Sequence, residues 1–115
     1  MLDLRHKGAL RLWAHTANYY WWKSDVIGRI YGVGLITFQY LRMQAGVDTT
    51  VPDKIIKRSM KCYFGLYAKG DVEFIKKIEE FSNIVRYSQI LICWAIWLKN
   101  AGVTNLQWEQ TRDYT

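Results

Sequence analysis

The apolar residues of this 115-residue chain recur at a helical spacing along most of its length. Near the start, this period predicts a helix over about residues 7–22. Ser24 or Asp25 can cap a second, short helix that runs to about Tyr31, because either side chain can accept a hydrogen bond from a first-turn N–H. The first part of the chain is therefore expected to be helical.

A turn with two glycines separates that short helix from the next one. The turn Gly32-Val33-Gly34 is followed by a helical pattern over residues 35–45, which Gly46 ends. Helix, tight turn and helix together predict a helix-hairpin-helix at about residues 24–45. Backbone N–H groups in such a turn can face outward toward an anion such as a phosphate.

After the hairpin, a further helix is expected with Thr49 or Thr50 as its cap. Pro52 then falls in its first turn, where a missing N–H costs nothing. Residues 65–70 break this helix. Its apolar face is formed by Ile55, Ile56, Met60, Cys62 and Phe64.

Two more helices are expected in the last part of the chain. Asp71 caps the first, and Ser82 or Asn83 opens a long one that closes at Asn100 and Gly102. No stretch alternates with the period of two residues that is typical of a strand. The sequence thus predicts an all-α fold, an orthogonal helical bundle of about 5 to 6 helices that contains the helix-hairpin-helix.

Composition fits one domain over residues 1–115, since half of the residues are hydrophobic and can form one core. Sixteen Lys and Arg against ten Asp and Glu give a net charge of +6, which favours a polyanionic partner or an anionic surface. A merely basic soluble protein is the alternative. Cys62 and Cys93 have no second Cys or His at metal-ligand spacing, so we expect neither a zinc site nor an iron–sulfur cluster.

The chain opens without an apolar stretch that could serve as a signal peptide, and the longest apolar run, residues 90–98, is about half a membrane span. We therefore expect a cytoplasmic, nucleoid-associated protein, or a nuclear one in a eukaryote, with no membrane partner. The aromatic cluster at residues 19–22 either supplies a wedge or stacking platform for DNA or fills the core.

Two segments carry a resemblance to a known family. Residues 29–37 read RIYGVGLIT and residues 51–58 read VPDKIIKR. They resemble the helix-hairpin-helix and the Gly/Pro-Asp signature of the endonuclease III superfamily of DNA glycosylases, and CWAIW at residues 93–97 is similar to a final core helix of that family. The chain is accordingly identified as a short or degenerate member, related to DNA repair hydrolases.

The resemblance implies double-stranded DNA as the partner and gives roles to several residues. Gly32, Val33, Gly34 and Ile36 would offer backbone N–H groups to one DNA phosphate. In the family, a monovalent cation in the hairpin is held by backbone carbonyls, and the matching residues here are Gly28, Ile30 and Val33. No other cofactor is implied.

Asp53 matches the catalytic aspartate of the family. The N-terminus of a helix keeps a carboxylate ionised, so it could stabilise positive charge on a deoxyribose ring or polarise an attacking water. The alternative for Asp53 is an acid that only caps the helix.

Basic residues around these segments fit a DNA-facing side, and their alternative is a solvated helix face. Those on the helix that begins near Asp53 are Lys54, Lys57, Arg58 and Lys61. Arg29 and Arg42 flank the hairpin.

Two departures from the family pattern limit the expected chemistry. Ile36 stands where bifunctional members have the Schiff-base lysine, so strand cleavage by that route is not expected, whereas hydrolysis by a monofunctional glycosylase is. Only 31 residues precede Gly32, so most of the pocket for an extruded base is expected to be missing. Either the chain binds DNA without base chemistry, or a second copy or another subunit completes the cleft.

Three functions follow as hypotheses from the sequence. The first is a DNA-binding protein that removes a damaged or mismatched base through Asp53. The second is a non-catalytic DNA-binding module, and the third is a helical protein-interaction domain without a nucleic-acid role.

Overall fold

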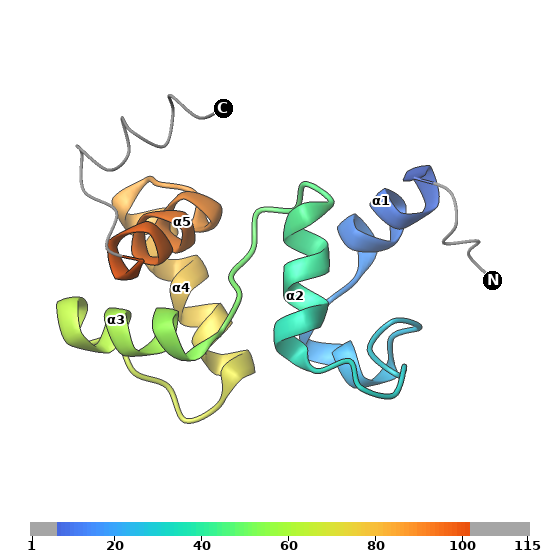
Figure 1. Ribbon diagram of the computed structural model, residues 1–115, viewed down its shortest axis with the longest axis horizontal. Coiled ribbons are helices and arrows are strands. Elements are labelled where there is room, and N and C mark those ends of the chain that lie inside the picture. Colours follow the sequence, from blue (N-terminus) through green and yellow to red (C-terminus); the bar gives the residue numbers. More distant parts are fainter. Residues whose placement is uncertain (1–6, 102–115) are drawn as a thin grey trace.

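The computed structural model describes residues 7–101, and these residues form five α-helices and one 3₁₀ helix with no strand among them (Figure 1). The predicted all-α class and number of helices are confirmed. Gly102, where the last helix was expected to close, lies outside the described residues. The helices are α1 (Lys7–Thr16), the 3₁₀ helix η1 (Tyr19–Ser24), α2 (Leu35–Gln44), α3 (Lys54–Phe64), α4 (Asp71–Val85) and α5 (Gln89–Asn100).

Two apolar clusters hold the helices together. In Figure 1, α1, η1 and α2 lie on one side, α3 to α5 lie on the other, and α3 runs crosswise to α2. In the N-terminal cluster, the Trp13 and Phe38 rings meet edge to face with centroids 5.4 Å apart. Ile75 of α4 packs into this cluster, while Met43 of α2 packs into the C-terminal cluster around Ile78. Each cluster therefore includes a side chain from the other group of helices.

A buried polar network also joins the two groups of helices. Arg42 of α2 donates from Nε to the Ala14 carbonyl at 3.0 Å and from Nη1 to the Gln39 Oε1 at 2.8 Å. Gln39 donates in turn to the Thr50 carbonyl at 2.9 Å, and the Thr50 hydroxyl donates to Oε1 of Gln89 at 2.7 Å. In residues 8–101 every fully buried side-chain N and O atom has a partner, so this network adds no unpaired polar group to the core.

The N-terminal third is less helical than its apolar period predicts. The predicted helix over residues 7–22 is interrupted because Asn18 is extended and its side chain accepts the Tyr20 N–H at 2.9 Å, which starts η1. The short helix expected after Asp25 is a series of turns instead. Asp25 still caps them, because its Oδ1 accepts the Ile27 N–H at 2.8 Å.

The start of α3 also differs from the prediction. Thr49 and Thr50 are buried in the polar network, and Asp53 is the N-cap, with Oδ1 accepting the Ile56 N–H at 2.7 Å. The predicted end is confirmed, since Gly65 closes α3 in the left-handed region at φ 65°. The cap is therefore neither Thr49 nor Thr50 but Asp53, as the alternative for that residue had it.

The boundary between the last two helices lies later than predicted. α4 continues through Ser82 and Asn83 and ends where Arg86 adopts a left-handed φ of 62°. Ser88 then caps α5 by accepting the Leu91 N–H at 3.1 Å. None of the helices within residues 7–101 combines the length and the apolarity needed to cross a bilayer.

Candidate nucleic-acid interface

The chain between η1 and α2 forms a tight hairpin. The Arg29 N–H donates to the Asp25 carbonyl at 2.9 Å, and the Val33 N–H donates to the Ile30 carbonyl at 3.0 Å. Gly32 lies between these turns at φ 90°, a conformation that residues with a Cβ rarely adopt. The predicted two-glycine turn is therefore present, although the segment before it is not a regular helix.

The hairpin leads into an uncapped helix N-terminus. Gly34 is the N-cap of α2, and no side chain of the described residues accepts a hydrogen bond there. The first hydrogen bond of the helix joins the Phe38 N–H to the Gly34 carbonyl at 3.0 Å, and the N–H groups of residues 34–37 have no acceptor within the described residues. Gly34 and Ile36 are exposed. These N–H groups can therefore receive an anion from solvent.

Exposed apolar side chains surround the hairpin, which the sequence did not indicate. Tyr31 at its tip is fully exposed, and Ile30 and Ile36 are about half exposed. In the aromatic cluster at residues 19–22, Tyr19 is buried in the core and Trp22 is half-buried, whereas the other two rings are exposed, and their role as a wedge or stacking platform stays a prediction. Several aromatic and aliphatic groups are thus available at this face for contact with a partner.

Charge is unevenly distributed along the chain. Residues 7–64 contain nine Lys and Arg against three Asp, whereas residues 65–101 contain five against four Asp and Glu. All three carboxylates of the first segment accept N–H groups. Asp25 accepts the Trp13 indole at 2.6 Å, and Asp48 accepts the Ile90 N–H at 3.0 Å. With Asp53 engaged as the α3 cap, the first half of the structure presents mainly positive charge to solvent.

Most of the predicted phosphate contacts are accessible. Those with exposed side chains are Arg29, Lys54, Arg58 and Lys61. Lys57 is half-buried, and its Nζ pairs with Oδ1 of Asp71 at 2.9 Å. The assignment of Arg42 to a phosphate is wrong, because this side chain is buried, burial lowers its pKa, and its donors serve Ala14 and Gln39. In Figure 1 the first turns of α2 and α3 both lie on the lower side of the molecule.

Asp53 is held by hydrogen bonds at both carboxylate oxygens. Oδ1 caps α3, and Oδ2 accepts the indole N–H of Trp97 on α5 at 2.7 Å. The side chain therefore ties the start of α3 to α5. Its catalytic role stays a prediction, while its capping role is observed.

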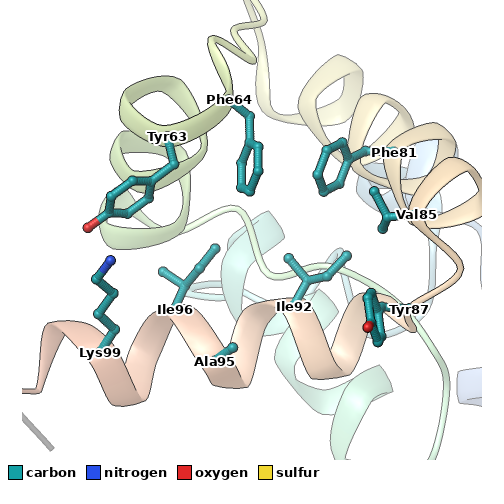
Figure 2. A pocket seen from close by; sticks show the side chains of 9 residues that line it. All are labelled: Tyr63, Phe64, Phe81, Val85, Tyr87, Ile92, Ala95, Ile96 and Lys99. Carbon is teal, nitrogen blue, oxygen red and sulfur yellow. The ribbon is translucent and has the colours of Figure 1, made fainter. Parts of the chain in front are cut away.

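An apolar hollow of about 540 Å³ lies between α3, α4 and α5 (Figure 2). Tyr63 and Phe64 form one side, and Phe81 lies opposite with its ring centroid 4.8 Å from that of Phe64. At one end Nζ of Lys99 lies 4.1 Å from the Tyr63 ring centroid. Asp53 is not among the residues that line this hollow, and the α3 residues that do, Tyr63 and Phe64, lie about 15 Å further along the helix at about 1.5 Å per residue. The hollow is therefore not placed to present a base to that carboxylate.

The carbonyl groups assigned to a monovalent cation are only partly available. The Ile30 carbonyl already accepts the Val33 N–H, whereas no hydrogen bond to the carbonyls of Gly28 and Val33 is found within the described residues. Gly28 itself has a packing reason to be glycine, because an added Cβ would lie 1.7 Å from the Trp22 carbonyl oxygen. The cation stays a prediction that rests on the family resemblance.

The two cysteines are free, with Cys62 exposed and Cys93 buried. Burial raises the pKa of the Cys93 thiol to about 11, which keeps it protonated and unreactive at neutral pH. Within residues 7–101, no three His, Cys, Asp or Glu side chains are grouped as metal ligands.

Comparisons with protein-family models, with curated proteins and with solved structures find no match to this chain. The relation to the helix-hairpin-helix glycosylases therefore stays a prediction from the motifs at residues 29–37 and 51–58. Function has to be argued from the groups that the fold exposes.

Proposed function

We propose that this protein binds double-stranded DNA through the hairpin at residues 25–34, the start of α2 and the exposed cations nearby. The observation that carries the proposal is the uncapped start of α2 at Gly34, whose N–H groups have no acceptor within the described residues and where Gly34 and Ile36 are exposed. A phosphate would accept these N–H groups and complete the helix N-terminus. Such a role places the protein with the nucleoid in the cytoplasm, or in the nucleus of a eukaryote.

The charge distribution supports this proposal independently of the hairpin. Arg29 and Lys54 are exposed, while the three Asp of the same half accept N–H groups of the protein. Lys and Arg that replace counterions along DNA make binding strongly salt-dependent. The preference for duplex DNA over other polyanions comes from the family resemblance.

Binding without base excision is the form that the geometry favours. Both oxygens of Asp53 are engaged by Ile56 and Trp97, and the apolar hollow is remote from this carboxylate. Base excision requires an extruded base in contact with the catalytic group. We therefore propose that the chain binds DNA, and we assign base excision to none of its residues.

Fluorescence anisotropy of a labelled duplex, measured over a series of salt concentrations, tests the proposal. The expected slope of log K against log salt is about −2 to −4, as follows from about 0.9 per neutralised phosphate. Arg29→Gln and Lys54→Gln should each weaken binding and reduce the slope by about 1. Lys76→Gln, at an exposed position on α4, is the matched control.

Absence of duplex binding at low salt would contradict the proposal, as would equal losses in the Lys76 control. Abasic-site formation on a panel of lesion-bearing duplexes, lost in Asp53→Asn, would show instead that the chain is a glycosylase.

A further inference from the structure

A second, basic hollow lies beside α3, away from the apolar one. Its volume is about 380 Å³, within the range of about 300–1,000 Å³ that small-ligand sites occupy. One wall is the solvent side of α3, and the other is the segment 66–69 with the first turn of α4. The lining residues that carry charge are Lys57, Arg58, Lys61, Lys69 and Asp71.

The two walls are brought together by the end of α3. Gly65 turns the chain in the left-handed conformation, and the Leu66 N–H donates to the Met60 carbonyl at 3.2 Å. Leu66 and Phe74 pack in the C-terminal cluster, so they form an apolar base beneath the charged rim. A base of low polarity strengthens the interaction of the rim cations with a bound anion.

The hollow contains an excess of positive charge. Four cationic side chains line it against the single carboxylate of Asp71, and that carboxylate already pairs with Lys57. Within the described residues, no carboxylate pairs with Arg58, Lys61 or Lys69. These three cations therefore face the hollow without a counterion from residues 8–101.

The charged groups next to the hollow do not neutralise its excess of positive charge. The Glu73 carboxylate accepts the backbone N–H of Lys69 at 3.3 Å. Lys77 is a further cation at the edge, and its Nζ donates to the Tyr67 carbonyl at 2.5 Å. Lys61 is positioned over the Tyr67 ring, with Nζ 5.3 Å from the centroid. The rim is thus partly organised before any ligand arrives.

We infer that this hollow is a binding site for a dianionic phosphate group, either inorganic phosphate or the terminal phosphomonoester of a nucleotide or DNA end. Three cations without a carboxylate partner in residues 8–101 exceed what one phosphodiester charge requires, whereas a phosphomonoester carries close to two negative charges at neutral pH. Lysines act as point charges for phosphate, and Arg58 adds a guanidinium that can donate two parallel hydrogen bonds. The site shares Lys57, Arg58 and Lys61 with the predicted DNA contacts but is separate from the hairpin, because none of its lining residues belongs to residues 25–36.

Titration of the ¹⁵N-labelled full chain with inorganic phosphate, at ionic strength held constant with chloride, tests this inference. The amide signals of residues 66–71 should shift and saturate at millimolar phosphate, and dimethyl phosphate should bind at least tenfold more weakly. The double variant Lys61→Gln, Lys69→Gln should weaken phosphate binding at least tenfold, while Lys76→Gln should leave it unchanged. Thermal unfolding of each variant verifies that it is folded.

Two further experiments identify the source of the phosphate and distinguish this site from the hairpin. A 5′-phosphorylated oligonucleotide that binds more tightly than its 5′-hydroxyl counterpart, with the difference lost in the double variant, identifies a DNA end as the source. Equal binding of the two, with phosphate still bound, identifies a small phosphate. Gly34→Pro should weaken duplex binding without changing the phosphate titration, so the two proposals can fail separately. No shift of residues 66–71, or equal binding by the double variant, overturns the inference.

Discussion

Asp53 provides the sharpest test of the structure, because its two oxygens have separate partners. In Asp53→Asn, the remaining carbonyl oxygen can still accept the Ile56 N–H, since Asn caps helices as well as Asp. The amide nitrogen that replaces Oδ2 cannot accept the Trp97 indole N–H. The substitution therefore removes one partner and retains the other.

The size of the effect follows from the interactions that are lost. A hydrogen bond to a charged group contributes about 1.5–3 kcal/mol, and the carboxylate at the start of α3 adds about 0.3–1 kcal/mol. Because Asp53 is only half-buried, we expect the free energy of unfolding to fall by about 2 kcal/mol. For a domain of this size that corresponds to a decrease in Tm of about 8–16 °C.

Denaturant unfolding of Asp53→Asn, Trp97→Phe and the double variant measures the interaction directly as a coupling energy. In the Trp97→Phe background, Asp53→Asn should cost at least about 1 kcal/mol less, because the indole donor is already absent. Asp48→Asn is the matched control, since its one N–H partner, from Ile90, is retained, and it should cost less than about 0.5 kcal/mol.

The reasoning is refuted if Asp53→Asn leaves stability unchanged or raises it. Unchanged stability would show that the hydrogen bond from Trp97 contributes nothing net, and a gain in stability is typical of a carboxylate kept for function at a cost in stability.

The other predictions concern the packing and the thiols. Gly28→Ala should destabilise the protein by at least about 3 kcal/mol, measured by thermal unfolding, because its Cβ would overlap the Trp22 carbonyl. Arg42→Met should cost about 2–5 kcal/mol in denaturant unfolding by leaving two buried acceptors unpaired, and a loss below about 1 kcal/mol would contradict the buried network. Burial raises the pKa of the Cys93 thiol to about 11 in the folded state, so the unfolded chain ionises this thiol at a lower pH. The stability that Cys93 contributes is therefore complete below about pH 9 and is lost as the pH rises toward 11. Cys93→Ala should reduce that decline, and the rest is due to groups such as Tyr19, whose pKa burial also raises. A thiol reagent should modify Cys62 in the native protein and Cys93 only after unfolding, and equal rates would contradict the burial.

The residue types in the sequence were sufficient to predict where a helix ends when a glycine ends it. Gly46 follows α2 and Gly65 closes α3, as predicted, because the left-handed conformation at a helix end depends mainly on the residue itself. Arg86 also adopts that conformation, although nothing in its residue type favours it. The end of α4 was therefore missed.

Residues with long-range partners were the ones that the sequence misassigned. The position of Arg42 next to the hairpin predicts a surface cation, but its hydrogen-bond partner Ala14 lies 28 residues earlier in the chain. Thr50 reads as a helix cap, but its hydroxyl donates to Gln89, 39 residues later. Such pairings arise only when the helices pack, so no period or spacing reveals them.

The candidate interface was predicted in part. Local glycines and cations indicated the hairpin and the exposed Lys54, while the exposure of Tyr31 at its tip was not foreseen. The basic hollow was also missed, because it requires Lys69 to return beside α3 after the turn at Gly65. Its one sequence signal is the spacing of four residues between Lys57 and Lys61, which places both on one side of the helix.

We propose that a DNA phosphate is held by the free N–H groups of Gly34 and the first turn of α2, and Gly34 gives a matched pair of variants to test this. An added Cβ at Gly34 meets no atom within 4 Å, and its φ of −95° suits other residues. Gly34→Ala therefore keeps the N–H, while Gly34→Pro removes it. In duplex-binding anisotropy we expect Gly34→Ala to bind as the original chain does and Gly34→Pro to bind at least fivefold more weakly, with both variants folded. Equal affinity of the two variants would contradict the claim.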